Sequence, residues 1–104
     1  MIAYYRREGM RNIPCSFDEW INNLPNSVMF LNKNDDHIVI TRFIGTVDLE
    51  VKPLQMYKTT TIVLVGKSKT PRDKTIRFSS TYEEAETLHR ISCEEVDINV
   101  ETDL

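Results

Sequence analysis

The fold of this chain is decided by residues 59–91, which read TTTIVLVGKSKTPRDKTIRFSSTYEEAETLHRI. Nearly all side chains of residues 59–65 are β-branched, and such side chains favour strands. Both alternating faces of this run are fairly apolar, which predicts a strand in the interior of a sheet. The polar segment Lys67–Lys74 predicts a hairpin loop, and Ile76 and Phe78 alternate with polar residues as in a half-buried second strand.

A helix is predicted to follow this hairpin. Ser80 with Glu83, or Thr81 with Glu84 one residue later, forms a capping box, in which the hydroxyl accepts a hydrogen bond from a backbone amide of the first turn. The residues at helical spacing, which we expect to face the sheet, are Tyr82, Ala85, Leu88 and either His89 or Ser92.

The first half of the chain predicts another helix and further strands. A capping box of Ser16 and Glu19 begins a helix over Phe17–Leu24, and Pro25 ends it. Its apolar stripe includes Trp20, which we interpret as a core anchor rather than a binding residue. Strands are predicted over Ile2–Arg7, Ser27–Leu31 and His37–Val47.

These elements predict an α+β fold with an antiparallel sheet of four or five strands and two helices packed on it. The length of 104 residues predicts a single domain over residues 1–93. Residues 94–104 carry five acidic residues and no basic ones, and we expect an acidic C-terminal tail or an edge strand there.

Composition excludes several classes of protein. The net charge is −3, and residues 1–93 carry 13 basic against 11 acidic residues, which argues against duplex DNA as an obligate partner. No apolar run approaches 20 residues and no secretion signal is recognisable, so we expect a cytoplasmic protein that does not enter a membrane. Two cysteines do not make a disulfide framework.

No catalytic or phosphate-binding motif is present in the sequence, so we expect a protein that is not an enzyme and uses no cofactor. The two histidines and two cysteines lack metal-ligand spacing, which excludes a typical zinc site. Cys15 precedes a helix start, where a thiol can have a lowered pKa, so it is either a reactive or a packing residue. His89 is either a structural residue at the edge of the helix or a general base or pH switch.

Two basic clusters are candidate binding sites for nucleic acid or nucleotides, since arginine beside aromatic side chains can stack bases and hold phosphates. The acidic Glu94 and Glu95 are candidates for contacts with a basic partner surface. The residues of the two basic clusters are Tyr4, Tyr5, Arg6 and Arg7, and Lys67, Lys69, Arg72 and Lys74.

A pattern of turn, cap and core residues extends over residues 4–92. It consists of Tyr4-Tyr5, Gly9, Ile13, Glu19-Trp20, Ile40–Gly45, Pro53-Leu54, Tyr57–Thr59, Arg77–Thr81, Glu84-Ala85 and His89. In this pattern the chain resembles a family of small uncharacterised proteins of phages and prophages. It departs from the family at Lys58, where an acidic residue is usual, and at Leu88, where a glycine is usual. The resemblance implies an accessory phage or prophage protein and implies no activity.

Three functions remain open from the sequence. The leading hypothesis is a non-enzymatic phage protein in the host cytoplasm that binds and modulates a host protein, as an inhibitor or an anti-defence protein. The acidic C-terminal segment would suit a host protein with a basic face, and an unpaired edge strand would allow a homodimer. The alternatives are a nucleic-acid or nucleotide binder, which requires the two basic clusters on one face, and an enzyme with Cys15 or His89 in its site.

Overall fold

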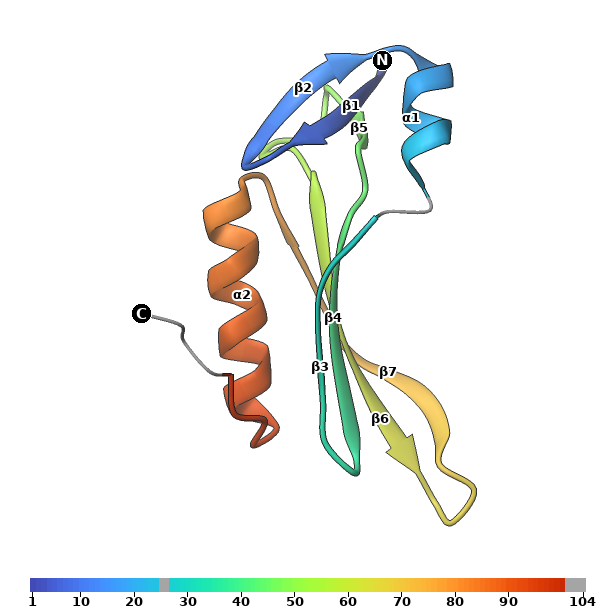
Figure 1. The fold of residues 1–104 in the computed structure, drawn as a ribbon, viewed down its shortest axis with the longest axis vertical. Coiled ribbons are helices and arrows are strands. Elements are labelled where there is room, and N and C mark those ends of the chain that lie inside the picture. The colour runs from blue at the N-terminus through green and yellow to red at the C-terminus, as the bar shows by residue number, and fades with distance from the viewer. Residues whose placement is uncertain (25–26, 101–104) are drawn as a thin grey trace.

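The computed structural model describes residues 1–24 and 27–100 of the chain. Within these residues the strands form two antiparallel sheets, of order β2-β1-β5 and β3-β4-β6-β7 (Figure 1). The elements, in chain order, are β1 (Ile2–Glu8), β2 (Arg11–Cys15), α1 (Phe17–Asn23), β3 (Val28–Lys33), β4 (His37–Phe43), β5 (Thr46–Asp48), β6 (Tyr57–Val65), β7 (Thr70–Ser79) and α2 (Tyr82–Glu95).

The structure confirms the α+β class and the antiparallel pairing, but it divides the strands between two sheets where one was expected. The division occurs inside the predicted strand His37–Val47. This segment forms β4 in the four-stranded sheet, breaks at residues 44–45, and continues as β5 in the three-stranded sheet. One continuous apolar run therefore contributes to both sheets.

Gly45 is the point at which the chain passes from one sheet to the other. Its φ angle is +72°, and a Cβ atom there would lie 2.5 Å from the carbonyl oxygen of Tyr5 and 2.9 Å from Cδ1 of Trp20. The Gly45 carbonyl accepts a hydrogen bond of 2.6 Å from the Tyr5 amide, and the indole of Trp20 donates one of 2.8 Å to the Ile44 carbonyl. Only glycine combines this backbone conformation with such close contacts.

The hairpin of β6 and β7 matches the sequence prediction in its strands but not in its loop. β6 lies between β4 and β7, which confirms the prediction of an interior strand. The turn spans residues 66–69, so the expected loop Lys67–Lys74 is too long, because its second half pairs with β6 as the start of β7. Pro71 is compatible with this pairing since β7 is an edge strand, which needs amide donors on one side only.

α2 packs on the four-stranded sheet. Thr81 is its N-cap and accepts a hydrogen bond from the Glu84 amide, so of the two predicted capping boxes the later one begins the helix. Leu88, expected to face the sheet, is partly exposed instead. The buried helical residues are Ala85, His89, Ser92 and Cys93.

Residues 96–98 continue the core beyond the end of α2. Asp97 has a φ angle of +58°, and the amide of Ile98 donates to the Cys93 carbonyl at 2.9 Å, as in a Schellman motif. Val96 and Ile98 are buried beside Val39 and Cys93. The boundary expected at residue 93 therefore falls inside α2, and residues 96–100 form no strand.

α1 begins as predicted, because Ser16 accepts a hydrogen bond from the amide of Glu19. The helix packs on β1 of the three-stranded sheet, and its apolar stripe is largely exposed: Phe17 is 48% exposed, and Ile21 and Leu24 are exposed as well. Trp20 is half-buried and forms an aromatic cluster with Tyr4 and Phe17, which also contact each other. The expected packing of this helix on the main sheet is corrected accordingly, and Trp20 anchors the junction between α1 and the strands.

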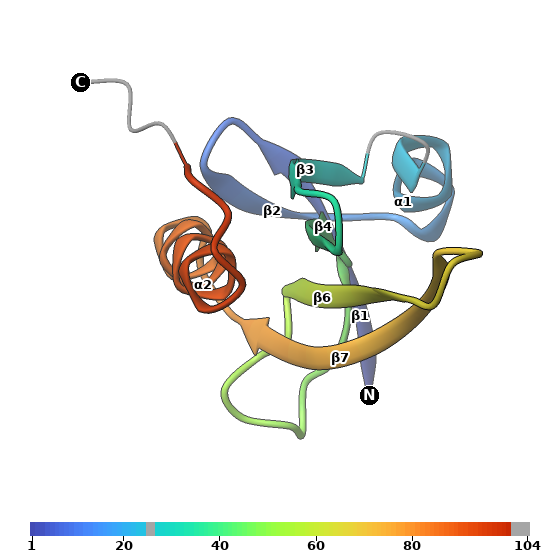
Figure 2. The same cartoon turned by 90° about the horizontal axis from the view of Figure 1, so that it is seen from below.

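Figure 2 looks along the long axis of the molecule and shows α2 on one side of the four-stranded sheet and α1 on the other. α1 packs mainly on β1, and the central residues of that second side, such as Ile40 and Thr60, are partly exposed. Among the described residues, no helix combines the length and the apolar composition needed to cross a membrane.

Candidate binding surface

The two predicted basic clusters do not share a surface. The first lies on β1, and the second lies in the β6–β7 turn and the start of β7. Figure 1 places β1 and this turn at opposite ends of the molecule, whose longest extent is 43 Å. The two clusters therefore do not form one compact nucleic-acid site in this fold.

The side chains of the first cluster have partners within the protein. Tyr4 packs edge-on against Phe17 at a ring distance of 5.3 Å, and Tyr5 packs against the core beside Phe43. Arg6 forms ion pairs with two carboxylates, those of Glu8 at 2.8 Å and Glu19 at 3.4 Å. The pKa of Arg6 is raised, first by its hydrogen bond to Glu8. Arg7 donates to the Gly9 carbonyl at 3.1 Å.

Of the remaining predicted binding residues, Lys69 and Glu95 form ion pairs within the protein. Lys69 contacts the Asp36 carboxylate at 3.1 Å, and Arg77 of β7 contacts both carboxylate oxygens of Glu95, at 2.6 and 3.0 Å. The hydrogen bond from Arg77 is the main cause of a lowered pKa for Glu95. The other four, which are exposed on the surface, are Lys67, Arg72, Lys74 and Glu94.

A network of hydrogen-bonded polar side chains is buried between α2 and the sheet. Nδ1 of His89 lies 2.8 Å from the hydroxyl of Thr41, which lies 2.8 Å from the hydroxyl of Thr59. Nε2 of His89 lies 2.8 Å from Oδ1 of Asn32, an acceptor. With this amide orientation Nε2 carries the proton and donates to Asn32, so Thr41 donates to Nδ1 and Thr59 donates to Thr41.

This network of hydrogen bonds fits a structural role for His89. The side chain is 4% exposed, and burial lowers the pKa of His89 from 6.5 to about 4, so the ring is neutral at pH 7. Both ring nitrogens are hydrogen-bonded to side chains of the sheet, which leaves neither free to accept a proton from a substrate. The network satisfies polar groups that α2 buries against threonines.

The cysteines show no sign of activation. The pKa of Cys15 is raised, mainly by burial. This shift is opposite in direction to the lowered pKa that a thiol at a helix start can have. Burial also raises the pKa of Cys93 to about 11. Among residues 1–24 and 27–100, no three metal-ligating side chains of the histidine, cysteine, aspartate and glutamate type gather in one place.

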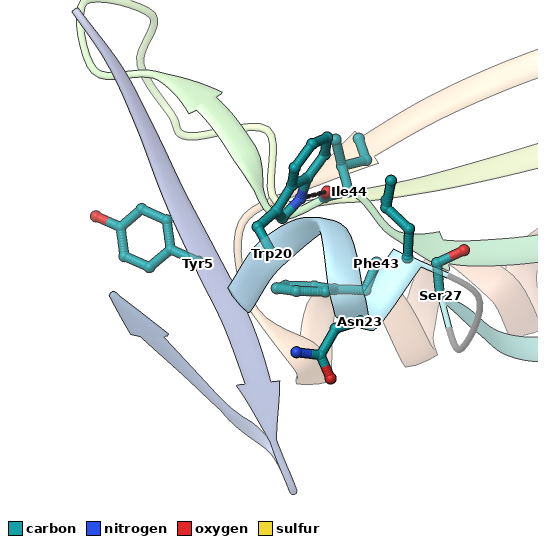
Figure 3. Close-up of a pocket in the computed structure, with 7 residues that line it drawn as sticks. Tyr5, Trp20, Asn23, Ser27, Phe43 and Ile44 are labelled. Carbon is teal, nitrogen blue, oxygen red and sulfur yellow. Dashed lines mark hydrogen bonds between the residues drawn. The ribbon is translucent and has the colours of Figure 1, made fainter. Parts of the chain in front are cut away.

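The pocket shown in Figure 3 lies where α1 meets the strands. It is lined by Trp20, Phe43 and Ile44 among others, and the figure shows the indole N–H directed at the Ile44 carbonyl. Its free volume is about 10 Å³, which holds at most one water molecule. This pocket is a packing defect at the junction rather than a ligand site.

Another candidate site is the face of the four-stranded sheet that α2 does not cover. Thr41 and Thr59 point towards His89 of α2, so their neighbours Ile40 and Thr60 point away from it. Residues paired across strands point to the same face, which gives three rows. Read from β3 to β7, the rows of this open face are Val28, Arg42, Lys58 and Phe78; Leu31, Ile40, Thr60 and Ile76; and Lys33, Ile38, Ile62 and Asp73.

The covered face and the open face differ in chemistry. On the interior strands β4 and β6, α2 covers three threonines, Thr41, Thr59 and Thr61. The same two strands present isoleucines to the open face, at positions 38, 40 and 62. The covered face also holds Val39, Phe43 and Tyr57, which are buried against α2, so both faces of these strands are partly apolar and α2 covers only one of them.

Side chains at the edges of the open face are exposed to a large extent. Leu31 on β3 is 53% exposed, and Ile76 and Phe78 on β7 are each 44% exposed. Single exposed apolar residues are common, but a continuous apolar patch on several strands marks an interaction site. The open face carries apolar side chains on all four strands, with Arg42, Lys58, Thr60, Lys33 and Asp73 among them, so it is a mixed apolar and charged surface.

Sequence reasoning missed this surface although a signal for it existed. The apolar character of both faces of residues 59–65 predicts an interior strand, and β6 is one. Two apolar faces also need two covering layers. Only one of the two predicted helices, residues 82–92, was long enough to cover a sheet of this width.

Comparisons with protein-family models, with curated proteins and with solved structures gave no match for this chain.

Proposed function

We propose that this chain is a small, non-enzymatic accessory protein of phage or prophage origin, which binds and modulates a host protein through the open face. The phage origin rests on the residue pattern over residues 4–92. The binding function rests on one observation: both faces of the sheet carry apolar side chains, and α2 covers only one of them, which leaves the face with Ile38, Ile40 and Ile62 without a covering helix. A partner that covers this face would complete a three-layer arrangement.

The energy available from this face is appreciable but limited. Complete burial of a leucine, isoleucine or phenylalanine side chain contributes roughly 1.5–3 kcal/mol. Leu31, Ile76 and Phe78 are about half exposed, so covering each of them would contribute about 1 kcal/mol. A micromolar complex needs about 8 kcal/mol after the costs of association. Polar contacts must therefore add to the apolar ones.

The test compares capture of host proteins by the wild-type chain and by two single variants. Ile76→Glu places a charge on the open face, where the side chain is 44% exposed. Ile91→Glu is the matched control, since Ile91 lies on α2 and is 40% exposed. Circular dichroism first establishes that both variants fold.

We expect a host protein that is captured by the wild type and by Ile91→Glu, and that is lost with Ile76→Glu. Equal capture by all three proteins would contradict the open face as the binding surface. Light scattering on the same samples tests the homodimer: a dimer that Ile76→Glu dissociates would assign the open face to a second copy of the chain and would contradict the proposal of a host partner at this surface.

A further inference from the structure

We infer that Arg42 and Lys58 form the polar anchor of the open face, and that they seat a carboxylate of an acidic amphipathic helix of the partner protein. This inference rests on the proposed function, because it names the chemistry of the segment that would cover the open face.

Arg42 on β4 and Lys58 on β6 are direct cross-strand partners, so they project side by side from the middle of the sheet. The Cβ atoms of such a pair lie about 4.5–5.5 Å apart, and like charges in this arrangement repel one another. In the part of the chain that the structure describes, neither side chain forms an ion pair with a carboxylate. Among the described residues four basic side chains do have an acidic partner, namely Arg6, Lys69, Arg77 and Arg90, so what distinguishes Arg42 and Lys58 is their direct pairing across two strands.

An anion between these two cations would relieve their repulsion. Arginine binds a carboxylate through two parallel hydrogen bonds, and lysine adds a point charge beside it. Desolvation by a bound partner would strengthen both contacts, since the dielectric constant falls at a covered interface.

The surroundings of the pair decide what carries the anion. Phe78 and Val28 flank the two cations in the same row, and Ile40 lies two residues along β4 from Arg42. Two residues along a strand correspond to about 6.7 Å. A bound helix can present an acidic side chain about one turn from an apolar one at nearly this spacing, because residues three or four apart on a helix lie about 5–6 Å apart.

The size and charge of the face agree with a helix of this kind. Four strands span about 14 Å, and a helix with its side chains is 10–12 Å wide. The rows carry three basic residues, Lys33, Arg42 and Lys58, against one acidic residue, Asp73. The charge of the open face is thus complementary to an acidic segment, whereas the outer side of α2 carries exposed glutamates and would repel it.

The inference is tested with two synthetic helical peptides that share one leucine stripe. One carries glutamate on both flanks of the stripe, and the other carries lysine at the same positions. Binding is followed by amide chemical shifts of the isotope-labelled full chain, at low and at high salt. The protein variants are the double substitutions Arg42→Glu with Lys58→Glu and Arg42→Ser with Lys58→Ser, and Ile91→Glu is the control.

We expect the glutamate peptide to shift resonances of the open face and to bind about tenfold more tightly than the lysine peptide, with a preference that weakens in high salt. The serine variant should abolish the preference, the glutamate variant should reverse it, and Ile91→Glu should keep it. Equal binding of both peptides at the open face would overturn the acidic anchor and leave the proposed function standing. Absence of shifts at the open face with both peptides would overturn the anchor and count against the proposed surface as well.

Discussion

Substitution of Gly45 by alanine is expected to be among the most damaging small changes in this protein. Gly45 lies where the chain leaves β4 and enters β5, and its φ angle of +72° belongs to the left-handed region. An added Cβ would approach the carbonyl oxygen of Tyr5 to 2.5 Å, and it would approach both Cε1 of Phe43 and Cδ1 of Trp20 to 2.9 Å. The first of these atoms belongs to the backbone of β1, which cannot move without shifting the three-stranded sheet.

Three effects add to the cost. The left-handed conformation of a non-glycine residue costs about 1–2 kcal/mol. Forcing a methyl group into a filled site costs typically about 1–3 kcal/mol. Displacement of Tyr5 would also weaken its 2.6 Å hydrogen bond to the Gly45 carbonyl, worth about 0.5–1.5 kcal/mol. Together they predict a loss of about 3–6 kcal/mol, against a total stability of about 5–15 kcal/mol for a domain of this size.

Gly66→Ala is the matched control for this experiment. Gly66 has a φ angle of +75°, and a Cβ atom there would meet nothing within 4 Å. This variant pays the conformational cost alone, about 1–2 kcal/mol. Urea unfolding followed by far-ultraviolet circular dichroism measures both variants, and a loss of 3–6 kcal/mol lowers the midpoint by at least about 1 M. If the two alanine variants are equally stable, the close contacts at Gly45 do not constrain the junction of the two sheets.

Two further predictions concern α2. The pKa of His89 is about 4 in the folded protein and 6.5 in the unfolded chain, so the unfolded chain binds more protons between these values, and stability should fall by up to about 3 kcal/mol as the pH is lowered from 6.5 to 4. Urea midpoints measured at pH 7 and 4.5 should show a smaller loss of stability in His89→Gln than in the wild type. An equal loss in both proteins would contradict the assignment to His89. Asp97→Gly should raise the thermal midpoint, with a gain of roughly 0.5–1 kcal/mol, because glycine adopts the φ angle of +58° freely and the substitution removes a negative charge from the helix C-terminus. The control Asp97→Ala removes the same charge but lacks the conformational gain. An equally stabilised alanine variant would assign the effect to charge alone.

The local elements of the fold were predictable from the sequence. The capping box of Ser16 and Glu19, the cap at Thr81 and the β-branched run that became β6 all depend on residues within a few positions of one another. Hydrogen bonds of a helix start and the side-chain alternation of a strand are local properties, so the amino-acid pattern determines them directly.

The clusters of basic residues in the sequence did not predict the candidate site. The clusters Tyr4–Arg7 and Lys67–Lys74 stand out in the sequence, but the fold places them at opposite ends of the molecule (Figure 1). Arg42 and Lys58 do not stand out, because sixteen positions separate them and each sits in an apolar strand. The register of β4 against β6 alone makes them neighbours.

The sequence by itself determined both helices, most of the strands, the α+β class and the antiparallel pairing, but it did not predict β2 or the first half of β7. Only the tertiary structure decided that the strands form two sheets, that α2 covers the face with Thr41 and Thr59, and that the opposite face has no covering helix. The physical reason is the range of the contacts. A row such as Leu31, Ile40, Thr60 and Ile76 joins four separate segments, and a helix can cover one side of it only.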